Sequence, residues 1–266
     1  MKFVIDHDYH IHSFLSSCSP DENEIPVNII KIAEENGYSS ICLTDHFWDD
    51  LVPGASGWYE PQNFAHISEA LPLPQSDKVK FYFGCEAEMD KFGTIGIAKE
   101  RLDKFDFIIV PTTHMHMMGF AIDEADNSIE RRAVKWVERF DALLDADLPF
   151  YKVGIAHITC PLIANVDKEA HIRVLDLISD EEMTRLFTKA ATVGLGIELN
   201  FNPFQYDEIL LEKVLRPYRI AKQCGCKFYL GSDAHHTSTL KAGKEKFEFI
   251  VDKLDLQESD KFTFIK

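Results

Sequence analysis

Short apolar runs recur along the chain, and each ends in polar or ionisable residues. Seven of these runs are rich in Val, Ile, Phe and Tyr: FVIDHDYHIH, SSICLTDH, KVKFYFGCEAE, FDFIIVPTTH, YKVGIAH, GLGIELN and CKFYLGSDAH. Apolar runs of this length and composition are typical of buried strands. The pattern therefore predicts seven strands, each with polar side chains at its carboxyl end.

Helix-like stretches lie between the predicted strands. Residues 26–36 have apolar side chains at helical spacing and are followed by Gly37, which suits a helix C-cap. Residues 128–145 form the clearest amphipathic pattern, and residues 180–192 and 207–224 give two more helices. Residues 49–77 are rich in Pro, Gly and polar side chains, so we expect a long loop with one short helix that overlies a site.

Strands that alternate with helices indicate a parallel sheet. Two architectures compete, a closed barrel and a doubly wound open sheet. An open sheet places its ligand at one switch point, whereas a barrel builds its site from many strand ends. Because polar residues end nearly every predicted strand, we expect an α/β fold of the TIM-like barrel type with about seven βα units. At 266 residues the chain suits a single domain over 1–266.

Composition and charge narrow the function classes. The chain is 45% hydrophobic, and its formal charge of −16 argues against a nucleic-acid-binding surface. No apolar run approaches the roughly 18 residues of a membrane span, and we expect no secretory signal. The six cysteines form no CxxC pair, which favours reduced thiols and a cytoplasmic location. The sequence carries no signal for the oligomeric state.

The candidate chemistry begins at His10 and His12. With 11 histidines in 266 residues, chance alone gives roughly half an His-x-His pair, so the motif by itself is weak. Side chains at i and i+2 share one face of a strand, however, so the two imidazoles converge on one point. Whether this motif binds metal depends on its position at a strand end and on the residues at the other strand ends.

Other imidazoles and carboxylates occupy the ends of the later strands. The later strand ends carry Asp45 and His46, Glu86 and Glu88, His114, His157, Glu198 and Asn200, and Asp233, His235 and His236. A mixed imidazole and carboxylate set suits Zn²⁺, Mn²⁺ or Fe²⁺ rather than a structural zinc held by four cysteines. These candidates exceed the needs of one tetrahedral ion, so we expect two or three divalent ions with a carboxylate such as Glu86 as a bridge. Clustered ions lower the pKa of a bound water and clamp the oxygens of an in-line displacement at phosphorus.

The ordered motifs DYHIH, LTDH, GCEAE, TTH, IAH and GSDAH resemble those of the PHP (polymerase and histidinol phosphatase) family. The resemblance runs from His10 to His235 and implies a distorted (β/α)7 barrel, a trinuclear metal site and phosphoesterase activity. Carried over residue by residue, it implies eight ligands: His10, His12, His46, Glu86, His114, His157, Asp233 and His235. Free-standing members of this length resemble histidinol-phosphate phosphatases, and we see no polymerase segment.

The function expected from these residues is hydrolysis of a small phosphomonoester by a metal-activated hydroxide. Glu86, Asp233 and His235 are the predicted catalytic residues, with Asp233 positioning or deprotonating the water. Histidinol phosphate is the leading substrate through the resemblance alone. The alternatives are a phosphodiesterase or nucleotidase, a catalytically silent metal-binding barrel, and an amidohydrolase-type barrel. The last typically has a Lys after strand four, where this chain has PTTH.

Cys18 marks a departure from the family pattern. Members usually have a His or Asp five or six residues after His-x-His, and this chain has Ser17 and Cys18 there. A thiolate binds Zn²⁺ or Fe²⁺, so Cys18 is one candidate for the substitute ligand. The other interpretation is a buried structural cysteine, the commoner fate of this residue type.

Several other polar residues receive structural or supporting interpretations. Asp8 and Asp45 are expected to orient ligating imidazoles, and Glu88 and Glu198 either do the same or pair with a neighbouring cation. Arg131 and Arg132 are expected on a solvated helix face. The remaining histidines are assigned to packing, to the surface or to the substrate-facing loops: His7, His66, His116, His171 and His236.

Overall fold

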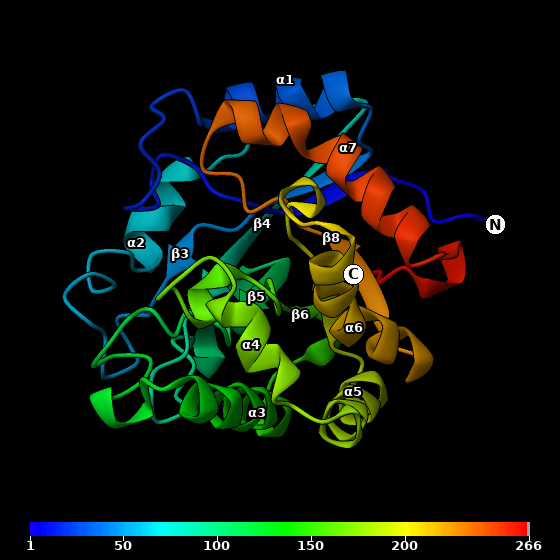
Figure 1. The fold of residues 1–266 in the computed structure, drawn as a ribbon. Coiled ribbons are helices and arrows are strands. Elements are labelled where there is room, and N and C mark those ends of the chain that lie inside the picture. The colour runs from blue at the N-terminus through cyan, green and yellow to red at the C-terminus, as the bar shows by residue number, and fades with distance from the viewer. Residues whose placement is uncertain (265–266) are drawn as a thin grey trace.

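A computed structural model describes residues 1–264, and the last two residues of the expected 1–266 domain lie outside the described part. The chain alternates strands and helices (Figure 1). The strands are β1 His7–Ile11, β2 Ser40–Leu43, β3 His46–Phe47, β4 Lys80–Ala87, β5 Phe107–Val110, β6 Val153–Ile155, β7 Gly196–Leu199 and β8 Lys227–Leu230. The helices are α1 Pro26–Asn36, α2 Phe64–Ile67, α3 Ile129–Asp145, α4 Ala170–Asp176, α5 Asp180–Val193, α6 Glu208–Gln223 and α7 Thr237–Lys253.

All strand pairs are parallel, in the order β1-β2-β4-β5-β6-β7-β8, with the short β3 paired to β4. The order follows the chain without the reversal of a doubly wound sheet. The two edge strands approach each other, and the Asp233 N–H donates to the His10 carbonyl at 2.8 Å. The sheet is therefore nearly closed into a distorted TIM-like barrel, as expected, with helices around it (Figure 1).

The predicted strands are confirmed, with one difference. The run SSICLTDH contains two strands, because the ladder from β2 to β4 breaks after Leu43 and resumes at His46. The apolar character of the runs explains their position, since every residue of β5 and β7 is buried. The helix at 26–36 ends as expected, with Gly37 in a left-handed conformation at φ 72°.

The end of the barrel away from the polar strand ends is filled by aromatic side chains. Tyr9, Phe107, Tyr229 and Phe262 pack together, and the Phe262 N–H donates to the Phe228 carbonyl. A Cβ on Gly154 would lie 2.4 Å from the Tyr229 ring, so only glycine leaves room for this packing. The polar strand ends consequently lie at the opposite end of a packed barrel.

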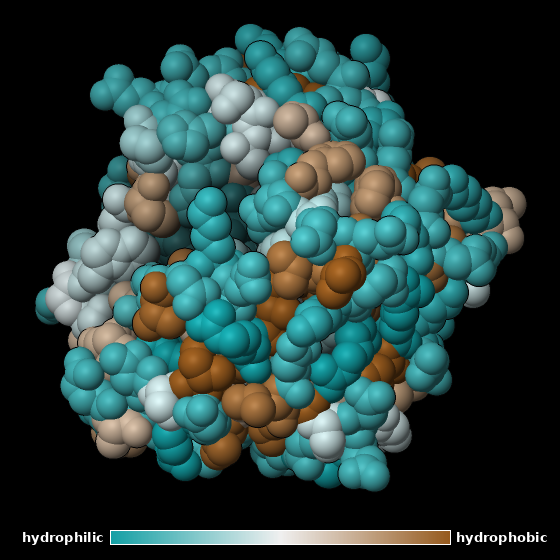
Figure 2. Space-filling view, in the orientation of Figure 1, coloured by the Kyte–Doolittle hydropathy of each residue, from teal (hydrophilic) through white to brown (hydrophobic). Residues whose placement is uncertain are grey.

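The surface is largely hydrophilic on the face drawn in Figure 2, with hydrophobic side chains gathered over the region of α3 and α4. Exposed Val134 and Leu177 belong to these two regions of the chain. Figure 2 also shows a recess over the region where β3 and β4 lie in Figure 1. Within residues 1–264, no helix combines the length and the apolar composition that crossing a bilayer requires.

Candidate metal centre

The eight predicted ligands lie together at the carboxyl ends of the strands, and we call them the ligand cluster. β1, β3 and β4 position His10, His46 and Glu86 directly, and the other five follow β1, β5, β6 and β8. Six members are buried, whereas Asp233 and His235 keep 29% and 23% of their side chains exposed. Folding thus joins residues from both ends of the chain in a mostly buried cluster that opens to solvent at Asp233 and His235.

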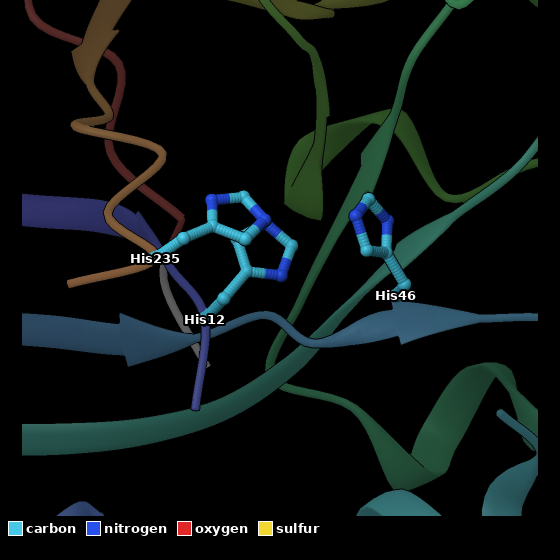
Figure 3. Close-up of side chains that lie close together, drawn as sticks. All are labelled: His12, His46 and His235. Atoms are coloured by element: carbon cyan, nitrogen blue, oxygen red, sulfur yellow. The ribbon is translucent and has the colours of Figure 1, made fainter. Parts of the chain in front are cut away.

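Potential ligand atoms fall into three overlapping groups, each with its atoms within 4.8 Å of one another. The groups are His12, His46 and His235; His10, His12 and Glu86; and Glu86, His114 and His157. Figure 3 shows the first group, in which the imidazoles converge from β3 and from the segments after β1 and β8. His12 belongs to two groups and Glu86 to two, which is the sharing expected of bridged ions.

Glu86 lies at the centre of the cluster. Its Oε2 is 2.7 Å from His46 Nδ1, and its Oε1 is 3.2 Å from His157 Nε2. Its oxygens also lie within 4 Å of ring nitrogens of the three other buried histidines, His10, His12 and His114. A single carboxylate between five imidazoles has the arrangement of a bridging ligand.

The outer ring nitrogens of the cluster are bound by the protein. His10 Nδ1 lies 2.6 Å from Glu198 Oε1, and His114 Nδ1 lies 2.6 Å from Glu88 Oε2. The other such pairs are His12 Nδ1 with Ser16 Oγ at 2.8 Å and His157 Nδ1 with Thr113 Oγ1 at 2.8 Å. When Nδ1 donates outward, Nε2 keeps its lone pair for a metal ion.

The inner atoms, in contrast, lack partners that satisfy them. His46 Nδ1 and Glu86 Oε2 are both buried without a hydrogen bond, although they face each other. His10 Nε2 and His12 Nε2 lie 3.0 Å apart, and Asp233 Oδ1 is 3.4 and 3.1 Å from them. Buried polar atoms left in this state fit divalent cations, and the donor set of imidazole and carboxylate suits the metals expected from the sequence.

Charges within the cluster shift the pKa values strongly. Burial lowers the pKa of His46, but the charge of Glu86 and the hydrogen bond to Cys18 raise it to about 10 overall. Burial raises the pKa of Glu86, yet the charges of His46 and His10 outweigh it and hold that pKa well below its usual range. In the protein alone, a proton on His46 compensates the buried Glu86 carboxylate; a bound cation would take over that role.

Two members of the cluster have strained backbones. His157 has φ 28° and Asp233 has φ 53°, both in the left-handed region that residues other than glycine seldom adopt. The His157 N–H is bound by Glu198 Oε2 at 2.6 Å, and the Asp233 N–H by the His10 carbonyl. These bonds hold the two side chains toward the cluster at a local conformational cost, which is common at functional sites.

Cys18 lies beside the first group, at the rim of the cavity. It is exposed rather than buried, so the structural-cysteine interpretation does not describe it. Partial desolvation of the sulfur alone would raise the pKa of Cys18, but hydrogen bonds with His235 and His46 lower it to about 7. The thiol therefore faces two candidate ligands, as a substitute ligand would.

The four residues expected to support the ligands differ in what they contact. Glu88 and Glu198 each bind the outer nitrogen of an imidazole, as expected. Asp45 acts one step further out, because it accepts from the Ser16 hydroxyl that contacts His12. The prediction for Asp8 is wrong, since its Oδ1 accepts from the His10 and Ser232 backbone N–H groups instead of from an imidazole.

The two helix arginines also differ from expectation in part. Arg131 is exposed and pairs with Asp126, as expected for a solvated face. The prediction for Arg132 is wrong, because it is 2% exposed and donates to the Met115 and Ile163 carbonyls. These two carbonyls, in the segments that follow β5 and β6, need hydrogen-bond donors, and Arg132 supplies them. The local sequence around Arg132 does not show this role.

The remaining histidines contact protein groups or solvent. His7 Nε2 accepts from the Leu230 N–H at 3.0 Å, and His66 Nε2 is 2.8 Å from the Leu15 carbonyl. His171 is buried and bonds the Tyr206 hydroxyl. His236 is exposed, and His116 lies on the cavity wall.

Sequence reasoning missed Arg139, which holds the loops around the centre. It is 4% exposed and donates to the carbonyls of Met89, Asp90, Thr112 and Ala121. Its guanidinium also lies 3.8 Å from Glu88 Oε1. Nothing in the amphipathic pattern of α3 distinguishes this arginine from the solvated Arg131 on the same helix.

A cavity of about 500 Å³ opens above the ligand cluster. It is lined by His46, His114, Asp233, His235 and Cys18, together with Trp58, Tyr59, His116, Met117 and Leu162. Trp58 and Tyr59 come from the long loop at 49–77, which therefore overlies the site as expected. That loop also contains α2, the expected short helix.

Comparison with known proteins places this chain in a family and gives solved structures of similar fold. A histidinol phosphate phosphatase from Lactococcus lactis, solved with Zn, L-histidinol and phosphate, is similar over 97% of this chain and 98% of its own, with TM-score 0.60 and 17% identity. A probable 2-pyrone-4,6-dicarboxylic acid hydrolase from Acinetobacter baumannii covers 98% of this chain and 97% of its own, at TM-score 0.49 and 13% identity. No curated protein matches. The PHP domain matches residues 8–200, so the chain belongs to the PHP domain family.

Proposed function

We propose that this protein is a metal-dependent phosphatase that hydrolyses a small phosphomonoester. The observation that carries the proposal is the position of Glu86 between five histidines whose outer nitrogens are mostly bound by the protein. Such a cluster is preorganised for more than one divalent ion, and paired ions are common in enzymes that cleave phosphoesters. The family and the likeness to a solved phosphatase support the same reaction class.

The ions would be held by the eight residues of the ligand cluster, with Cys18 as a ninth ligand in the group of His12, His46 and His235. Two or three ions of Zn²⁺, Mn²⁺ or Fe²⁺ suit these donors. When bound, the ions supply the Lewis acidity that lowers the pKa of water and neutralises the phosphate oxygens.

The chain's own residues orient and confine the reactants. Glu198 and Glu88 fix the planes of the His10 and His114 rings through the outer nitrogens. Asp233 Oδ1 lies at the inner edge of the cavity, where it would hold a proton of the attacking water while the new bond to phosphorus forms. The ester P–O bond then breaks, and a solvent water would protonate the leaving oxygen.

The lining of the cavity also supports metal dependence. Among residues 1–264, no lysine or arginine lines it, and three of its four histidines are candidate metal ligands. A phosphate dianion bound there needs positive charge from another source. Histidinol phosphate is one substrate to test, because the similar phosphatase was solved with histidinol and phosphate.

The decisive variant is Glu86→Gln, assayed for phosphate release from 4-nitrophenyl phosphate with Zn²⁺, Mn²⁺ or Fe²⁺. We expect a loss of about 10³-fold, because the substitution removes the shared charge and one ligand oxygen. Circular dichroism checks that the fold survives, and Glu248→Gln on the exposed face of α7 is the matched control. Normal turnover by Glu86→Gln would sink the mechanism, and preference for bis(4-nitrophenyl) phosphate would instead favour a diesterase.

A further inference from the structure

The outer part of the cavity has a different chemistry from the ligand cluster. Its side chains are Trp58, Tyr59, His116, Met117 and Leu162, which we call the outer wall. They come from three loops, after β3, β5 and β6. Within the described part of the chain, no lysine, arginine or glutamate lines the cavity, and Asp233 is its one carboxylate.

Tyr59 contributes its ring rather than its hydroxyl. The hydroxyl donates to Glu88 Oε2 at 2.5 Å, and the side chain is 1% exposed. Its polar end is therefore already bound on the protein side. The ring is almost fully covered, so it backs the wall behind Trp58, adjacent to His46 at a ring separation of 6.0 Å.

Trp58 forms an aromatic corner with Tyr59. The two rings are 4.6 Å apart and nearly perpendicular, at 89°. Trp58 also packs edge-on against His46 at 5.2 Å, so its indole stands directly beside a candidate metal ligand. Its relative exposure of 36% is high for a tryptophan and leaves ring surface open to a bound molecule.

Met117 and Leu162 extend this apolar surface on the loops after β5 and β6. Both are partly buried, so they present side-chain carbon and sulfur at the cavity mouth. A thioether contacts aromatic rings favourably, and a flexible methionine adapts to the shape of a ring. The wall thus offers aromatic and aliphatic contact, with few groups to bind sugar hydroxyls.

We propose that the outer wall selects phosphomonoesters whose leaving group carries an uncharged aromatic ring. This inference rests on the proposed function and names its substrate class. A cationic leaving group would need a carboxylate partner, and Asp233 Oδ1 already lies 3.1 and 3.4 Å from His12 and His10 Nε2. Burying an unpaired ammonium against Trp58, Met117 and Leu162 is costly, whereas a neutral ring gains contact area.

The reaction itself is unchanged hydrolysis. Water oxygen forms the new bond to phosphorus, and the ester P–O bond breaks with its electron pair leaving on the alcohol oxygen. That oxygen takes a proton and leaves as the free aromatic alcohol, with inorganic phosphate as the second product. No oxidant or co-reactant other than water is required.

The test compares benzyl phosphate with O-phosphoethanolamine, two alkyl monoesters whose leaving groups differ mainly in ring and charge. We expect the metal-loaded protein to prefer benzyl phosphate in kcat/KM by about tenfold or more. Trp58→Ala should remove most of that preference by lowering kcat/KM for benzyl phosphate. The kcat/KM for O-phosphoethanolamine should stay within about twofold of the wild-type value. Tyr151→Ala, at an exposed aromatic residue outside the cavity, is the matched control.

The outcomes separate the two proposals. Equal kcat/KM for the two esters, a preference for L-histidinol phosphate over benzyl phosphate, or an equal effect of Trp58→Ala on both esters would overturn the inference. If no monoester is hydrolysed, the proposed function fails. Calorimetry then compares the binding of benzylphosphonate and 2-aminoethylphosphonate and so tests the selectivity of the outer wall separately. Tighter binding of benzylphosphonate, lost in Trp58→Ala, would support it; equal binding would refute it.

Discussion

The ligand cluster and the outer wall lie in one cavity but are built on different principles. The cluster sits on strand ends, and hydrogen bonds such as the 2.6 Å contact between His10 and Glu198 fix its rings. The wall sits on loops, and its side chains are positioned by ring packing such as that between Trp58 and Tyr59. Chemistry that needs fixed charge is placed on the rigid sheet, and selection by shape is left to loops that tolerate change.

Removing the metal ions tests the ligand cluster directly and should have the largest effect on activity. Chelation should abolish phosphate release and lower the free energy of unfolding, by about 2.7 kcal/mol for each ion present at 100 times its Kd. Differential scanning calorimetry before and after chelation measures the change. Full turnover in chelator, with metal analysis confirming removal, would contradict a metal-dependent reaction.

Glu198→Gln tests whether the outer hydrogen bonds matter as much as the ligands. The variant keeps an oxygen near His10 Nδ1 and the His157 N–H but loses the charge that both contacts use. We expect metal affinity to fall by about 10–100-fold while the benzyl preference of the wall stays the same. Titration with Zn²⁺ in competition with a chromogenic chelator measures this, beside Glu248→Gln; affinity equal to the control would show that the outer bonds are dispensable.

Cys18→Ser separates the group at the cavity rim from the two buried groups. We expect one ion fewer per chain, because serine is a poor replacement for a thiolate ligand. In the Co²⁺-substituted protein, the sulfur-to-metal charge-transfer absorption should disappear in Cys18→Ser and persist in Cys224→Ser, whose thiol contacts the Thr184 carbonyl. Persistence of the band in Cys18→Ser would exclude this cysteine as a ligand.

His7→Phe tests the difference between a structural histidine and a ligand histidine on the same strand, β1. It should have the smallest effect on activity. His7 is as buried as His10, but both of its ring nitrogens have protein partners, Asp6 and the Leu230 N–H. Losing the acceptor for that N–H should cost about 1–3 kcal/mol of unfolding free energy without changing metal content. Urea denaturation of the metal-free protein and elemental analysis measure the two quantities.

The same variant carries a pH signature. Burial lowers the pKa of His7 below its ordinary value, despite the opposing effect of Asp6. Because the unfolded chain takes up the proton first, this residue makes the wild type lose stability as the pH falls below about 6.5. The stability difference between wild type and His7→Phe should therefore shrink from pH 7.5 to pH 5.5, and a constant difference would refute this role.

The strands and the clearest helices could be predicted because their signal is local. β5 is continuously apolar, and α1 is ended by a glycine at the position where a left-handed residue is needed. α7 was missed, since Thr237–Lys253 contains a glycine, β-branched residues and many charges. It is helical because its buried face packs beside α1 (Figure 1), a tertiary contribution that outweighs local propensity.

The sequence by itself determined which residues form the ligand cluster and the order in which the strands deliver them. Residue type, position at a strand end and the period of two in a strand supplied the candidates, and the resemblance to the PHP family selected eight of them. Only the tertiary structure decided which ring nitrogen faces inward, because the partner that fixes His10 is 188 positions away at Glu198. It also decided that Cys18 faces the cavity and that Trp58 and Tyr59 form its wall, since loop placement depends on long-range packing that no local pattern encodes.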